Sequence, residues 1–352
     1  MRSQQSKAAG AAVLAIVLAG LSACGGGGGS AGDTSTSQPL PTTFPGVKPT
    51  AGDYYIYTVT ASTTTPANVQ PTTTTSVRTY SVVNSDGSYT RVVTGTSIKQ
   101  SRDYAADGKV ATSSSVSQQC AYSPGYLISP AAGTAVGQTY SGTTSETCTI
   151  SGGSGPSTAT LTTSGTADAI ESVTTAAGTF RAFKYTSTYV RTNGTYVSTT
   201  LETCWTDMVL GRSVKCNTSY TTVQSTDQSV IGAGSSTSEL TAYSAAGAAP
   251  VGSTLPRFVG SWRVTFAGAA TGYCSNAAVT TAGAITSSCV RTNSSGSVIG
   301  NFTVSGSVDV NGVVSATGSD GSSFTGSLTS PTAGAGAWVN GSMSGTWTAD
   351  HL

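Results

Sequence analysis

Charged side chains are scarce in this 352-residue chain: they make up 9% of it, against about 25% in an average globular domain. The formal net charge is only +1, and lysine and arginine do not gather into clusters. A nucleic-acid-binding surface needs such clusters, so we expect no nucleic-acid partner. Serine, threonine, asparagine and glycine supply the polarity, and 37% hydrophobic residues argue against disorder beyond residue 50.

Histidines and closely spaced cysteines are lacking as well. The one histidine, His351, is next to the C-terminus, where we expect a solvated tail. Catalysis by a serine–histidine–aspartate triad therefore has no internal histidine to use. No Cys-x-x-Cys pair occurs, so the sequence predicts neither a metal site nor another cofactor.

Helical periodicity is missing after the first 23 residues. Runs of β-branched and aromatic residues occur instead, separated by turn signals such as Asp86-Gly87, Asp107-Gly108 and Asn193-Gly194. The pattern predicts an all-β protein with two antiparallel β domains. The expected strands of the first domain are 52–60, 77–83, 89–94, 97–105, 110–119, 138–142, 146–150, 159–164, 167–173, 180–191, 195–205, 209–215 and 218–224.

The apolar run from Ala8 to Leu21 follows a charged start and is too short for a lasting membrane span, as in a secretory signal. It ends in Leu21-Ser22-Ala23-Cys24, which resembles the lipobox of bacterial lipoproteins. The resemblance implies cleavage before Cys24 and attachment of a diacylglycerol and an N-acyl chain to it. The alternative is an ordinary signal peptide with a chance cysteine.

Lipidation would place the protein in the bacterial cell envelope, with the acyl chains on Cys24 as its contact with the membrane. Gly25, rather than aspartate, follows the cysteine. In the lipoprotein family this is compatible with sorting to the outer membrane, and the choice between the inner and outer leaflet stays open.

The chain has seven cysteines, an odd number. Assigning Cys24 to lipid leaves six, and export to an oxidising compartment favours disulfides among them. Six cysteines allow fifteen connectivities, of which the pairing of sequence neighbours is the simplest. Each such bridge closes a short loop, worth about 3 kcal/mol in the chain-entropy model. The expected bridges are Cys120–Cys148, Cys204–Cys216 and Cys274–Cys289.

Composition also predicts the order of the segments. Glycine, serine and proline dominate residues 25–50, which we expect to be a tether without core contacts. A stretch of small residues with two prolines, 245–256, interrupts the strand pattern. The predicted segments are a signal peptide (1–23), the lipidated cysteine and tether (24–50), a first β domain (51–245), a linker (246–256) and a second β domain (257–350).

Residues 171–185 resemble the E-x-V-x-x-x-x-G-T-F-x-A-x-K signature of several uncharacterised bacterial envelope β-proteins. In those proteins a tryptophan-containing strand and a G-x-x-V-K turn follow, and Cys204-Trp205 and 211–215 match both. The resemblance implies an antiparallel, partly closed sheet or flattened barrel, and it assigns no catalytic residue.

The second domain opens at 258–266 and closes at 341–347, with alternating apolar residues from Phe302 to Val310 and a turn at Asn311-Gly312. Glycines recur every six residues from Gly300 to Gly318, and we interpret them as bends and turns, not as a solenoid. The layout resembles small β-barrel-like modules of bacterial surface lipoproteins.

Two groups of side chains are candidates for binding or chemistry. Tyrosines could form a platform for sugar or peptide, although half-buried sheet positions are the more common role of such residues. The platform candidates are Tyr54, Tyr55, Tyr57, Tyr185, Tyr189 and Tyr196. Carboxylates among the strands could serve glycoside hydrolysis, but no spacing selects a pair. These are Asp53, Asp103, Asp168, Glu171, Glu202 and Asp207.

The favoured hypothesis is a non-enzymatic, membrane-anchored envelope lipoprotein for display, adhesion or assembly, with an envelope protein or a glycan as partner. One alternative is a carrier of lipid or lipoprotein with an apolar β cavity. Another is a carboxylate-based glycan hydrolase. We assign no catalytic residue.

Overall fold

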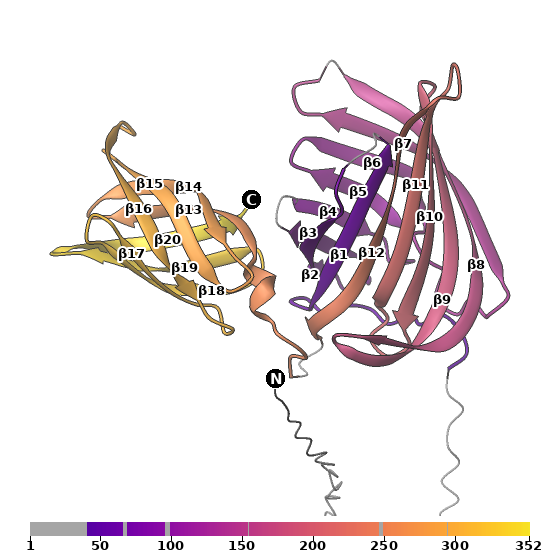
Figure 1. The fold of residues 1–352 in the computed structure, drawn as a ribbon, viewed down its shortest axis with the longest axis horizontal. Helices are drawn as coiled ribbons and strands as arrows, with labels where there is room; N and C mark the ends of the chain where they lie inside the picture. The colour runs from indigo at the N-terminus through magenta and orange to yellow at the C-terminus, as the bar shows by residue number, and fades with distance from the viewer. Residues whose placement is uncertain (1–40, 66–68, 96–98, 154, 246–248, 294) are drawn as a thin grey trace, which may run out of the picture. The chain divides into compact units, whose positions relative to one another are not determined.

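The computed structural model describes residues 41–65, 69–95, 99–153, 155–245, 249–293 and 295–352. They form two closed antiparallel barrels, of twelve and eight strands (Figure 1), which confirms the predicted all-β fold of two antiparallel domains. No part of the described chain forms a helix that is long and apolar enough to cross a membrane. Cys24 lies outside the described residues.

In the first barrel each strand pairs with the next along the chain, and β12 returns to pair with β1, from Tyr54↔Ser244 to Thr65↔Ala233. Figure 1 shows these two strands side by side. The strands are β1 (Tyr54–Thr65), β2 (Thr72–Val83), β3 (Tyr89–Gly95), β4 (Lys99–Tyr104), β5 (Val110–Ser115), β6 (Gln118–Tyr126), β7 (Thr139–Ile150), β8 (Pro156–Thr175), β9 (Gly178–Thr192), β10 (Tyr196–Asp207), β11 (Ser213–Gln224) and β12 (Val230–Ser244).

The closing strand β12 is absent from the predicted strands. Its sequence is rich in serine, glycine and alanine, which have weak β propensity, but pairing with both β11 and β1 compensates. Pairing with neighbouring strands also joins two predicted pairs of short strands: 138–142 and 146–150 form β7, and 159–164 and 167–173 form β8. The predicted strand 110–119 instead divides into β5 and β6.

Aromatic and aliphatic side chains fill one end of the first barrel. They come from the starts of β1, β9 and β11 and from the ends of β2 and β12, which lie at one end because neighbouring strands are antiparallel. This cluster includes Tyr55, Tyr80, Phe180, Val214 and Leu240.

Residues 41–50, here called the strap, pack on the first barrel, although the sequence predicts a tether without core contacts. Phe44 is buried, and its ring centroid lies 5.4 Å from that of Phe183 and 5.8 Å from that of Tyr185. Its backbone N–H donates to the Thr134 carbonyl at 2.7 Å, and its carbonyl accepts from Gly133 N–H. One aromatic residue in a proline-rich segment gives no periodicity, so the pattern did not predict this contact.

Replacing Phe44 by alanine should lower the free energy of unfolding of the first barrel by about 3 kcal/mol, because the change removes a buried ring from a packed site. Chemical denaturation followed by circular dichroism measures the loss. The matched control is Thr42→Ala, at an exposed strap position, which should stay within about 0.5 kcal/mol of wild type. Equal stability of the two variants would show that the strap does not contribute to the fold.

The second barrel has a filled core. Its strands are β13 (Gly260–Gly268), β14 (Thr271–Val279), β15 (Ala284–Thr292), β16 (Val298–Val308), β17 (Val313–Gly318), β18 (Ser323–Leu328), β19 (Ala333–Asn340) and β20 (Met343–His351). Trp262, Phe266, Trp338 and Trp347 are buried among smaller apolar residues, and the short 3-10 helix η1 (Leu255–Phe258) adds Phe258. Gly312, at φ +88°, forms the predicted turn between β16 and β17, and the barrel is not a solenoid.

His351 is not a solvated tail residue, contrary to the prediction. It ends β20, is 1% exposed, and its Nε2 atom lies 3.0 Å from the Val259 carbonyl oxygen. Burial lowers the pKa of its imidazole. The physical reason is that β20 closes the barrel by pairing with both β13 and β19, which encloses even the last residues of the strand.

Candidate functional site

The first barrel encloses a cavity of about 560 Å³, within the roughly 300–1,000 Å³ that ligand sites in proteins occupy. Alternation along the strands sends every second side chain into this lumen. The wall consists mainly of arginine, tyrosine, serine and threonine, and its aliphatic members are Val59, Val93, Ile128 and Leu161. A twelve-stranded barrel is too wide for its side chains to fill, which leaves the polar space open.

Three lumen arginines lie on consecutive strands: Arg78 on β2, Arg91 on β3 and Arg102 on β4. Arg91 and Arg102 are direct cross-strand partners and so share one face. Like charges in this position destabilise a sheet, so strand pairing alone does not favour them. The Arg78 guanidinium carbon lies 4.0 Å from the ring centroid of Tyr57, a cation–π contact that holds it against the wall.

Two glutamates also line the cavity, in different surroundings. Glu146 on β7 accepts a hydrogen bond from Arg191 Nε at 2.7 Å and lies 2.5 Å from its Nη2 atom. Glu202 on β10 has a raised pKa, because burial outweighs the charges of Arg78, Arg102 and Arg91. Among the described residues, no ion pair within 4.0 Å joins Glu202 or any of these three arginines to an opposite charge.

The cavity is therefore positive: four arginines and two glutamates line it, a formal charge of +2 with both glutamates ionised. A cavity of about 180 Å³ adjoins it at the strap end, shares Arg78 and Arg91 with it, and adds Arg212. A third, of about 380 Å³, shares Arg102 and Arg191. The arginines thus follow the lumen from one end to the other.

The six candidate tyrosines do not form one platform. Tyr57, Tyr185 and Tyr189 line the central cavity or the strap-end cavity, and Tyr196 lines the cavity at the other end. Tyr55 belongs to the aromatic cluster, and Tyr54 lies on the opposite face of β1. Tyr122 and Tyr126, which the sequence did not single out, also line the central cavity.

Of the six candidate carboxylates, only Glu202 lines the central cavity. Asp53 and Asp207 accept hydrogen bonds from backbone N–H groups at turns, and Asp103 and Asp168 accept them from threonine hydroxyls. Glu171 accepts one from the Trp205 indole. The sequence did not single out Glu146. Its one signal in the sequence is that it lies two residues before Cys148 in a predicted strand, and side chains two residues apart share one face of a strand.

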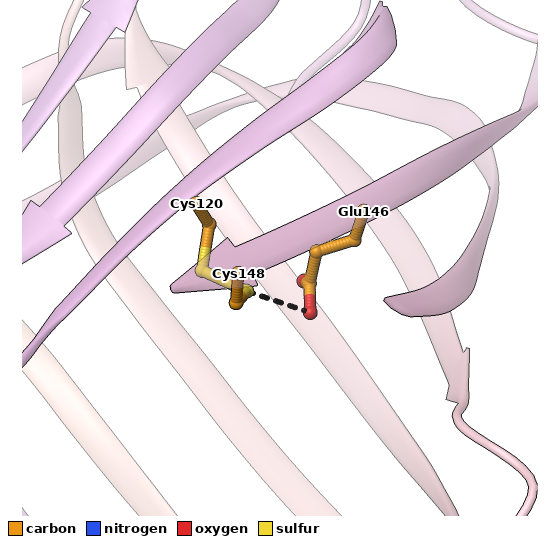
Figure 2. A group of neighbouring side chains, drawn as sticks. All are labelled: Cys120, Glu146 and Cys148. Atoms are coloured by element: carbon orange, nitrogen blue, oxygen red, sulfur yellow. Dashed lines mark hydrogen bonds between the residues drawn. A yellow bond between two sulfur atoms is a disulfide. The ribbon is translucent and has the colours of Figure 1, made fainter. Parts of the chain in front are cut away.

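The structure contains the three predicted disulfides: Cys120–Cys148, Cys204–Cys216 and Cys274–Cys289. Each joins directly paired residues on neighbouring strands. Figure 2 shows Glu146 beside the first of them, with a carboxylate oxygen 3.2 Å from the Cys148 sulfur. This sulfur carries no hydrogen and is no thiolate, so the grouping does not offer a metal its usual ligand.

The second such grouping among the described residues, Glu202 with Cys204 and Cys216, is excluded for the same reason, because both sulfurs belong to a disulfide.

No family model and no curated protein matches the chain. Two solved structures are similar to it. The hypothetical lipoprotein YmcC from Escherichia coli K12 has 8% identity and a TM-score of 0.30, covering 52% of this chain and 86% of that one. An exported protein with a YmcC-like fold from Bacteroides fragilis has 9% identity and a TM-score of 0.29, covering 58% and 100%. Both TM-scores are too low to support an argument about this chain.

Proposed function

We propose that the protein is a lipid-anchored envelope lipoprotein whose first barrel is a non-enzymatic binding module for a polar ligand. The observation that supports this most is the central cavity, whose wall is polar and rich in arginine. Burying charged groups is costly, so a core selected for stability alone would not contain them. The module would serve display, adhesion or assembly, with the acyl chains on Cys24 as anchor and the outer membrane as its place.

The carrier hypothesis is less well supported. Bound acyl chains need a continuous apolar wall, whereas the central cavity has arginines on three neighbouring strands. An apolar gap of about 60 Å³ in the second barrel has room for only a few atoms.

One observation favours a hydrolase as the second candidate. Glu146 and Glu202 line the same cavity, and their surroundings differ: the first is in an ion pair with Arg191, while burial raises the pKa of the second. Such a difference suits a carboxylate paired with a general acid. Under this hypothesis envelope glycans incubated with the protein gain reducing ends, and Glu202→Gln abolishes the gain.

Thr200→Trp should abolish ligand binding, because residue 200 lines the cavity and the added indole obstructs the lumen without changing the charge. Thr199→Trp is the matched control, since Thr199 is exposed on the same strand. The measurement is the sugar, phosphate and protein content that stays with each detergent-extracted form, at equal circular dichroism. We expect at least about a tenfold loss for Thr200→Trp alone. Equal retention by both variants would refute binding in the lumen.

A further inference from the structure

We infer that the ligand of the lumen is an acidic oligosaccharide. Its carboxylates would bind to Arg78, Arg91 and Arg102. This inference rests on the proposed function and names the class of ligand that the lumen takes.

The three arginines present donors that the protein itself does not neutralise. No ion pair within the described chain engages them, and the buried Nε atom of Arg91 has no hydrogen-bond partner there. A guanidinium offers five N–H donors in a planar fork that matches a carboxylate. An anion in the lumen would therefore satisfy groups whose burial is otherwise unfavourable.

Glu202 faces these arginines across the lumen. Around the closed barrel of twelve strands, β10 lies five strands from β3 by the shorter path. Since six strands would be directly opposite, Glu202 and Arg91 lie on nearly opposite walls. The electrostatic interactions of Glu202 reach all three arginines. An anion bound by these arginines would occupy the cavity that Glu202 also lines, so the charge of Glu202 opposes binding.

The rest of the wall favours a sugar over other anions. Tyr122, Tyr126 and Tyr189 line the central cavity and are partly exposed, so that aromatic rings are available to the C–H faces of sugars. Ser198 and Thr200 supply hydroxyl partners for sugar hydroxyls.

A phospholipid would bring acyl chains that this polar wall does not match. The arginines also extend through adjoining cavities, which suits a chain with repeated carboxylates better than a single small anion.

The experiment is calorimetric titration of the full-length, detergent-solubilised protein at about pH 8, where an ordinary glutamate is ionised. The probes are tetragalacturonate, the neutral maltotetraose, tetraglutamate and inorganic phosphate. We expect tetragalacturonate to bind more tightly than the other three. Arg91→Gln and Arg102→Gln should each weaken this binding at least about tenfold, since each removes a charge-assisted contact.

Two further variants test whether the arginine substitutions weaken binding through the lost charge or through misfolding. Glu202→Gln removes the opposing charge from the same lumen and should tighten binding several-fold. Arg263→Gln removes a positive charge from an exposed position of the second barrel and should leave binding unchanged. Weaker binding by Glu202→Gln, or an equal loss with Arg263→Gln, would overturn the inference.

The probes give the other decisive outcomes. Tetraglutamate, maltotetraose or phosphate binding as tightly as tetragalacturonate would overturn the inference but leave a lumen that binds ligand. In another outcome, tetragalacturonate fails to bind while the wild-type protein still retains envelope material that Thr200→Trp loses. This result would overturn the inference but not the proposed function. Loss of that retention as well would refute the proposed function itself.

Discussion

Cys24→Ala is expected to move the protein almost entirely from the membrane pellet to the soluble fraction, with both barrels still folded. A single acyl chain binds membranes only marginally, so the diacylglycerol and N-acyl chain expected on Cys24 would form the anchor. After residue 24 the sequence has no apolar run of about 18 residues that could replace it. Cell fractionation and circular dichroism of the released protein provide the measurement.

Ser22→Ala is the matched control, because it keeps a small residue in the lipobox and should leave the protein in the pellet. If Cys24→Ala also stays there, another surface binds the membrane and the lipoprotein hypothesis loses its mechanical role. If it unfolds, the segment before the strap contributes to a core.

Trp262→Ala is expected to destabilise the second barrel by about 3 to 5 kcal/mol, a large part of the roughly 5–15 kcal/mol of a typical domain. Trp262 is 1% exposed at the centre of the filled core, and its indole N–H donates to the Phe258 carbonyl at 2.9 Å. The change therefore leaves both a cavity and an unsatisfied acceptor. Calorimetry should show a melting temperature lower by roughly 15 °C or more for this barrel.

The transition of the first barrel should stay in place, since Trp262 belongs to the core of the second. Val313→Ala, at an exposed position of the second barrel, is the control and should shift neither transition measurably. A common shift of both transitions with Trp262→Ala would show that the barrels unfold as one unit, against the predicted linker at 246–256.

Local signals in the sequence predicted most hairpins and the three disulfides. The Asn193-Gly194 and Asn311-Gly312 turns join strands that are adjacent in the chain, and each cysteine pair lies on two such strands. These features depend on residues that are less than about thirty positions apart in the chain. Alternating apolar residues and turn residues are signals over such short distances.

The lumen could not be predicted in this way. Arg78, Arg91 and Arg102 alternate with other residues as on any solvent-exposed strand face. Whether that face points outward or into a barrel depends on closure and on strand number, because eight strands leave an interior that side chains fill and twelve do not. The first barrel closes only through strand β12. Because the weak β propensity of β12 kept it out of the predicted strands, the sequence pattern did not indicate the cavity either.

The pairing of β1 with β12 also fixes an order of assembly. The edge of β1 stays unpaired until residues 230–244 have been synthesised, so the first barrel cannot close while its chain is still being made from the N-terminus. During that interval an open strand edge is exposed to other chains, which is a hazard for aggregation. The long-range seam also makes folding slow, because loop closure over most of the domain must precede the last ladder. The interval between synthesis of β1 and closure of the barrel is therefore the stage at which a chaperone would act, and under the proposed envelope location that chaperone would be a periplasmic one.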